Sequence, residues 1–179
     1  MGPVRIAFAA AFAAAAVSAC SGPATSAGPD AQAIQASYYL AVGDSLSQGV
    51  QPNATGASVE TKQGYPDQVY AALRRSHPAL RLVKLGCPGE TTSTMIHGGI
   101  CRYAGGSQLA AAVAFLRAHR GHVLLITIDI GANDAEGCGS QPGLSKVVSC
   151  FFTGVPGAVS RLATIMARLR AAAGPSAGC

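Results

Sequence analysis

The stretch VLLITIDI at residues 123–130 decides the fold, because it is almost continuously apolar. Such a run is typical of a central strand that is covered on both faces. Two shorter runs also predict strands: YYLAV at residues 38–42 and LRLVKL at residues 80–85. Each of the three runs leads directly into a glycine and then into an unusual loop. These loops begin at Gly43, Gly86 and Gly131.

Segments with helical spacing of apolar residues follow the strands. The first spans residues 65–73, the second follows a capping residue, Ser107, and ends near residue 120, and the third runs from about residue 155 to residue 173. The alternation of strand and helix predicts an α/β fold: a three-layer α/β/α sandwich around a parallel sheet. In such sheets the functional loops follow the carboxyl ends of the strands.

The N-terminus predicts export. Arg5 precedes a short apolar run that matches the core of a secretory signal and is too short to span a bilayer. We expect residues 1–19 to be a signal peptide, residues 20–36 a flexible tether rich in Ser, Gly, Pro and Ala, and residues 37–179 the folded domain. The segment ending at Cys20 resembles a lipobox, which would make Cys20 the lipidated first residue. Cleavage at an ordinary small-residue site is the alternative; both interpretations place the protein outside the cell or on its surface.

The cysteines fit an oxidising compartment. Cys87 lies close in sequence to Cys101, and Cys138 lies close to Cys150, so two local disulfides are expected, although spacing alone leaves the connectivity open. Cys179 is left over. The spacing of Cys and His matches no zinc motif, and we expect neither a metal nor a cofactor.

The net charge of +5 does not predict a nucleic-acid partner. The Lys and Arg residues are scattered along the predicted helices rather than clustered on one segment, and several fall near helix C-termini, where the helix dipole favours a positive charge. We expect a monomer whose only attachment to a membrane would be a lipid on Cys20.

Polar residues and glycines able to support catalysis occur in all three strand-end loops. Ser45 follows the first strand; a lone serine in that position is usually a helix cap. Gly89, after the second strand, offers an unobstructed backbone N–H. Asn133, after the third, is ordinarily a turn former, but its side-chain amide is also a suitable donor to a developing oxyanion.

Together these loops resemble a known family. The segments GDSL (residues 43–46), GET (89–91) and GAND (131–134) resemble blocks I, II and III of the SGNH/GDSL hydrolases, in the same order. The resemblance extends from about residue 38 to residue 173, and the cysteine-rich loops resemble those of exported actinobacterial esterases and lipases. It implies a flavodoxin-like fold and hydrolysis of small-molecule or lipid esters.

The resemblance also implies residue roles. Ser45 would be the nucleophile that forms an acyl-enzyme, and the oxyanion would be held by the N–H groups of Ser45 and Gly89 and by the side chain of Asn133. Asp44 is expected to shape its turn, and Asp134 to brace its loop.

The family's fourth block, D-x-x-H, does not occur in this sequence. His77, His119 and His122 precede predicted strands and belong at the opposite end of the sheet from Ser45. His97 is on the correct side, but no acidic residue is placed to orient it. We therefore expect a domain that lacks the final strands and histidine block, as a C-terminally truncated product would, with little activity. The alternative is a non-catalytic surface lipoprotein that binds a ligand in the same cleft.

Overall fold

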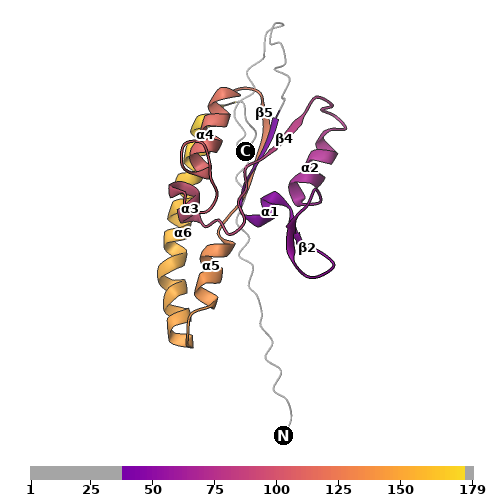
Figure 1. The fold of residues 1–179 in the computed structure, drawn as a ribbon. Helices are drawn as coiled ribbons and strands as arrows, with labels where there is room; N and C mark the ends of the chain where they lie inside the picture. Colours follow the sequence, from indigo (N-terminus) through magenta and orange to yellow (C-terminus); the bar gives the residue numbers. More distant parts are fainter. Residues whose placement is uncertain (1–37, 176–179) are drawn as a thin grey trace. The chain divides into compact units, whose positions relative to one another are not determined.

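The computed structural model describes residues 38–175 (Figure 1). The expected signal peptide, the tether, Cys20 and Cys179 lie outside this range. The elements are, in chain order, β1 (Tyr38–Gly43), α1 (Ser45–Gln48), β2 (Val50–Pro52), β3 (Ser58–Glu60), α2 (Tyr65–Leu73), β4 (Arg81–Lys84), α3 (Thr92–His97), α4 (Gln108–Ala118), β5 (Val123–Asp129), α5 (Ala132–Gly139) and α6 (Leu144–Ala173).

The main sheet has three strands in the order β4-β1-β5, and both pairings are parallel. The predicted α/β class with a parallel sheet is therefore confirmed. The expectation that residues 123–130 form the central strand is wrong for the described residues, because β1 is central and β5 pairs only with β1. A continuous apolar run indicates that both faces of a strand are covered by helices. It does not indicate whether the strand has a hydrogen-bonded neighbour on each of its two edges.

Helices lie on both faces of the sheet (Figure 1), which gives the three predicted layers. Alternate residues of β1 point to opposite faces, as the pleat requires. Leu40 and Val42 pack in the larger cluster with residues of α3, α4 and α6. Tyr39 and Ala41 pack in the smaller cluster with Leu80 and residues of α2. Residues 39–42 are completely buried, so β1 is held rigidly up to the point where it meets Ser45.

Two stretches between the predicted strands and helices contain additional regular structure. Residues 48–63 include the antiparallel β2–β3 hairpin, and residues 86–106 include the short helix α3, whose first turn is capped by Thr91. The strands of the hairpin have three residues each and α3 has six. Elements this short do not repeat their pattern of apolar residues often enough to be recognised in the sequence.

The third long helix begins earlier than predicted. α6 starts at Leu144 rather than near Val155, and Pro156 lies inside it. Gly154, Pro156 and Gly157 indicate a helix start by local rules, because proline is favoured in a first turn and glycine disfavours a helix interior. Packing against α5 and the Cys138–Cys150 disulfide favour the longer helix over these local preferences.

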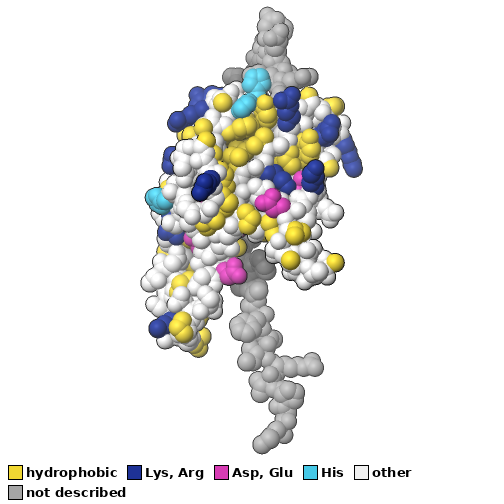
Figure 2. All heavy atoms as spheres, in the orientation of Figure 1, with side chains coloured by type: hydrophobic (Ala, Val, Ile, Leu, Met, Phe, Trp, Pro, Cys, Tyr) yellow, Lys and Arg dark blue, Asp and Glu magenta, His cyan; other side chains and the backbone are white. Residues whose placement is uncertain are grey.

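Both expected disulfides are present. Cys87 is bonded to Cys101 in the loop after β4, and Cys138 in α5 is bonded to Cys150 in α6. The predicted cap is also present, because the Ser107 hydroxyl accepts a hydrogen bond from the Ala110 N–H at 3.2 Å. On the face shown in Figure 2, Lys and Arg side chains are dispersed among uncharged ones and form no single basic patch.

Candidate active site

The carboxyl ends of the three parallel strands meet in close contact. The Asp44 N–H donates to the Asp129 carbonyl at 3.0 Å, and the Cys87 N–H donates to the Gly43 carbonyl at 3.0 Å. Gly43 has a φ of 134°, and a β-carbon there would lie 1.9 Å from the Asp129 carbonyl oxygen. Only glycine therefore allows β1 and β5 to approach this closely, and the three predicted loops emerge side by side.

Ser45 is the first residue of the short helix α1. Asp44, not Ser45, is the N-cap, because its Oδ1 accepts a hydrogen bond from the Leu46 N–H at 3.0 Å. The expectation that Asp44 shapes the turn is thus confirmed. Ser45 is half-buried, and within residues 38–175 neither its hydroxyl nor its backbone N–H makes a hydrogen bond. Both groups remain available to a ligand.

Gly89 occupies a turn formed by residues 87–90. The Glu90 N–H donates to the Cys87 carbonyl at 3.0 Å, Pro88 is at the second position, and Gly89 at the third has a φ of 81°. These features define a type II turn, which requires a positive φ at that position. Gly89 is exposed, and in the described part of the chain its N–H has no hydrogen-bond partner.

Asn133 lies in the first turn of α5 and reaches the same turn. Its Nδ2 donates to the Glu90 carbonyl at 2.7 Å, so one amide N–H is fixed next to Gly89 and the other remains free to donate. The structure therefore brings the loops of Ser45, Gly89 and Asn133 together at the carboxyl edge of the sheet.

Asp134 braces its loop, as expected. It accepts hydrogen bonds from the Thr92 N–H at 2.7 Å and from the Thr92 hydroxyl at 2.6 Å. Arg161 of α6 donates to the same carboxylate at 3.2 Å and to the Thr92 hydroxyl at 2.8 Å. These bonds join the start of α3, the start of α5 and the middle of α6, so Asp134 holds these three segments together.

Two buried polar residues near these loops were missed by the sequence reasoning. Gln108 is completely buried and bonds the backbone of Gly43, 65 positions away. No local pattern could have revealed this contact. Asp129 was visible in principle, because a carboxylate inside an otherwise apolar strand needs a partner.

Asp129 is electrostatically unusual. The pKa of its carboxyl is raised to about 7, mainly by burial and also by the adjacent Asp44 carboxylate, although the Tyr65 hydroxyl, which donates at 3.0 Å, lowers it. Its Oδ2 is buried without a hydrogen-bond partner among the described residues. Burial likewise raises the pKa of the Glu90 carboxyl, despite hydrogen bonds from Thr94 and Gln108 that lower it.

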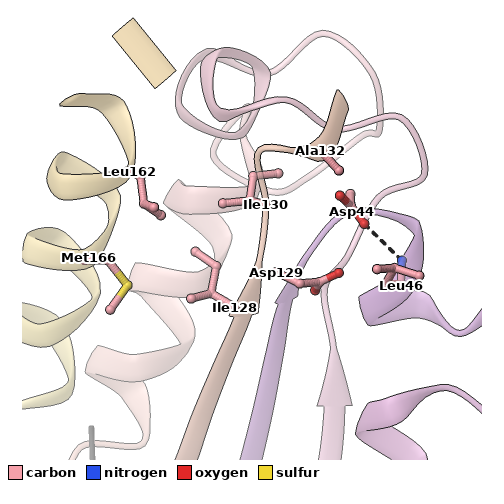
Figure 3. A pocket seen from close by; sticks show the side chains of 8 residues that line it. All are labelled: Asp44, Leu46, Ile128, Asp129, Ile130, Ala132, Leu162 and Met166. Atoms are coloured by element: carbon pink, nitrogen blue, oxygen red, sulfur yellow. Dashed lines mark hydrogen bonds between the residues drawn. The ribbon is translucent and has the colours of Figure 1, made fainter. Parts of the chain in front are cut away.

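A pocket of about 490 Å³ opens next to the β1–α1 turn that carries Ser45, although Ser45 itself does not line it (Figure 3). The residues on either side of Ser45 in the chain, Asp44 and Leu46, form one wall. The other walls are formed mainly by Ile128 and Asp129 of β5, by Ile130 directly after it, and by Leu162 and Met166 of α6. Most of this lining is apolar.

The histidines lie where the sequence analysis placed them. His77 and His119 precede β4 and β5. The His122 carbonyl accepts a hydrogen bond from the Tyr38 N–H at the start of β1, which marks the amino edge of the sheet. His97 ends α3 and is exposed, and its ring makes no hydrogen bond within residues 38–175. In the same range, no group of three or more His, Cys, Asp or Glu side chains is arranged to hold a metal ion.

These motifs and this fold agree with a family model. Residues 41–178 match the model of the GDSL-like lipase/acylhydrolase family. The chain belongs to this family. Its GDSL segment is the β1–α1 turn described above, and the two other matching segments are the turn of Gly89 and the start of α5.

Two solved structures are similar to the chain. One is an extracellular lipase from Streptomyces rimosus, with 24% identity and a TM-score of 0.51 over 79% of this chain. The other is a phospholipase A1 from Streptomyces albidoflavus, with 24% identity and a TM-score of 0.49 over 80% of this chain. The chain spans 57% of the length of each. At this identity the first likeness shows the fold alone. No curated protein matches the chain.

Proposed function

We propose that the chain is an exported serine esterase that cleaves carboxylic esters through an acyl-enzyme on Ser45. One observation carries the proposal. A free serine hydroxyl lies at the same sheet edge as two free backbone N–H groups, those of Ser45 and Gly89, and an anchored side-chain amide, that of Asn133. Family membership supports ester chemistry at this edge.

The proposed reaction follows from these groups. The Ser45 hydroxyl attacks the ester carbonyl and transfers its proton to a water molecule, which later returns a proton to the departing alkoxide, and the carbonyl oxygen becomes an oxyanion held by the three donors. Each such donor typically contributes roughly 3 kcal/mol of transition-state stabilisation. The intermediate then releases the alcohol, and water hydrolyses the acyl-enzyme.

The proposed substrate is an ester with an apolar acyl group, either a small molecule or a lipid. The apolar walls of the pocket next to the β1–α1 turn support this choice, because buried apolar surface contributes about 25 cal/mol per Å² to binding. The two disulfides support export, since such bonds persist in oxidising compartments.

A fast reaction also needs a base stronger than water that accepts the proton of Ser45. None of the four histidines is hydrogen-bonded or ion-paired to a carboxylate within residues 38–175. A serine without such a base retains only the residual catalysis that comes from the oxyanion hole and substrate binding. We therefore propose slow turnover by this chain. The same observation favours a second candidate, a surface lipoprotein that binds a ligand in the cleft without turnover.

Hydrolysis of p-nitrophenyl butyrate and labelling by a fluorophosphonate probe distinguish the two candidates. The esterase proposal expects slow ester hydrolysis and labelling at Ser45, located by peptide mass, with both lost in Ser45→Ala. Imidazole in the buffer should accelerate the hydrolysis by acting as an external base. The matched control is Ser76→Ala, which removes an exposed serine outside the β1–α1 turn. Equal hydrolysis and labelling in the native chain and in Ser45→Ala would refute the esterase proposal and favour the binding protein.

A further inference from the structure

Gln108 makes an unusual pair of contacts with the strand that leads to Ser45. Its Oε1 accepts a hydrogen bond from the Gly43 N–H at 2.7 Å, and its Nε2 donates to the Gly43 carbonyl at 2.9 Å. A neighbouring strand would satisfy these groups in the same way. Because Gln108 is completely buried, water cannot replace either bond. The residue two positions before Ser45 is therefore held in place by a side chain from α4.

The same side chain also reaches the loop of Gly89. Gln108 Nε2 lies 3.1 Å from Oε2 of Glu90 and 3.3 Å from the hydroxyl of Tyr103. Glu90 is the residue after Gly89 and is only 1% exposed. The Tyr103 hydroxyl donates in turn to the Leu85 carbonyl at 2.6 Å, at the end of the neighbouring strand. Gln108 therefore touches both strand-end loops at once.

Glu90 extends the connection to the third loop. Its backbone carbonyl accepts the hydrogen bond from the Asn133 amide at 2.7 Å, and its backbone N–H closes the turn that holds Gly89. The loops of Ser45, Gly89 and Asn133 are thus joined through Gln108 and Glu90 by direct hydrogen bonds between buried or half-buried groups.

We propose that Gln108 is a positioning residue of the oxyanion hole, which sets the N–H of Gly89 and the amide of Asn133 relative to Ser45. This inference rests on the proposed function. Gln108 acts on the oxyanion hole indirectly, through its hydrogen bonds to Gly43 and Glu90. A side chain that cannot make these bonds would leave the Gly43 N–H without its buried partner and remove one of the hydrogen bonds to the Glu90 carboxyl, and the two loops would shift. A displacement of about 1 Å in such a site can slow a reaction about 100-fold.

The test is the rate of phosphonylation of Ser45 by a fluorophosphonate probe, which needs no turnover. Its phosphoryl oxygen takes the place of the substrate oxyanion. We expect Gln108→Leu to lower the maximal rate constant, kinact, about 100-fold while KI changes less than about threefold, because the donors bind the phosphoryl oxygen more strongly in the transition state, where its negative charge is larger, than in the initial complex. The matched control is Gln68→Leu, which removes an exposed glutamine that also donates to a backbone carbonyl. It should leave both constants unchanged.

The variant Gln108→Glu keeps the test valid if Gln108→Leu does not fold. A protonated glutamate carries one donor and one acceptor and can replace the amide, whereas an ionised one has acceptors only and faces the Gly43 carbonyl and Glu90. The kinact of Gln108→Glu, divided by that of the native chain, should therefore be highest at low pH and fall as the pH rises. A simple loss of packing would give a ratio that is independent of pH.

The possible results distinguish a failure of the positioning role from a failure of the proposed function. Native kinact in Gln108→Leu, or a pH-independent ratio for Gln108→Glu, would overturn the positioning role and leave the proposed function intact. A native chain that is not labelled at Ser45 would overturn the proposed function, and this inference with it.

Discussion

Replacing Asp134 by alanine tests whether this residue is a brace or a reacting group. The carboxylate accepts two hydrogen bonds from Thr92 and one from Arg161. Thr92 is 1% exposed, so its N–H would lose its partner without gaining water. Hydrogen bonds to a charged group are each worth about 1.5–3 kcal/mol, so the two from Thr92 contribute about 3 kcal/mol at the low end of that range.

The ion pair with Arg161 adds little to this sum. The Arg161 side chain is 35% exposed, and an ion pair open to solvent is worth at most about 1 kcal/mol. We therefore expect Asp134→Ala to lower the free energy of unfolding by about 3–4 kcal/mol. Asp134→Asn retains one acceptor oxygen and should lower it by about half as much.

Urea denaturation followed by circular dichroism measures this change. Glu136→Ala is the matched control, because Glu136 is an exposed carboxylate on the same helix, and it should alter the free energy of unfolding by less than about 0.5 kcal/mol. A loss below about 1 kcal/mol in Asp134→Ala would refute the bracing role. If stability were unchanged while labelling of Ser45 disappeared, Asp134 would belong to the reacting groups instead.

Three further predictions concern other parts of the site. Burial and the neighbouring Asp44 raise the pKa of Asp129 from 3.8 to about 7, so the native state holds a proton that the unfolded chain releases. The free energy of unfolding should therefore fall as the pH rises between these two values. Asp129→Asn should remove this pH dependence, as measured by urea titrations at several pH values. Replacing Cys138 and Cys150 by serine should lower the free energy of unfolding by about 3 kcal/mol, because the bond closes a short loop between α5 and α6, and an unchanged urea midpoint would contradict this. Asn133→Ala should lower kinact for phosphonylation of Ser45 about 100-fold while the urea midpoint changes little, and a native kinact would exclude Asn133 from the oxyanion hole.

The sequence was sufficient to predict the features that depend on local chemistry. The apolar run at residues 123–130, the cap at Ser107 and the glycine at position 43 each leave a signal within a few residues, and the structure has a strand, a helix N-terminus and a tight strand end at these places. Because parallel strands end at the same edge of a sheet, the three loops could also be brought together without coordinates.

What the sequence did not reveal depends on tertiary contacts. Gln108 appears from its neighbours to be an ordinary first-turn residue of a helix, and its partner Gly43 is 65 positions away. The first part of α6 contains Pro156, and its helical state depends on the packing of α5 and on a disulfide. That β1 is the central strand could not be predicted either, since strand order is not encoded in the apolar character of one strand.

The close contacts at the strand ends limit which residues can replace the glycines there during evolution. At position 43 the place of a β-carbon is already filled by the Asp129 carbonyl, and at position 86 by the hydroxyl of Ser47, which is itself fully buried. At Gly89 there is nothing within 4 Å, and only the backbone angle restricts the residue. Among descendants of this sequence we expect glycine alone at positions 43 and 86, whereas position 89 would also admit asparagine, which tolerates a positive φ. We therefore expect close backbone and side-chain contacts at the strand ends to restrict positions 43 and 86 independently of the chemistry of Ser45.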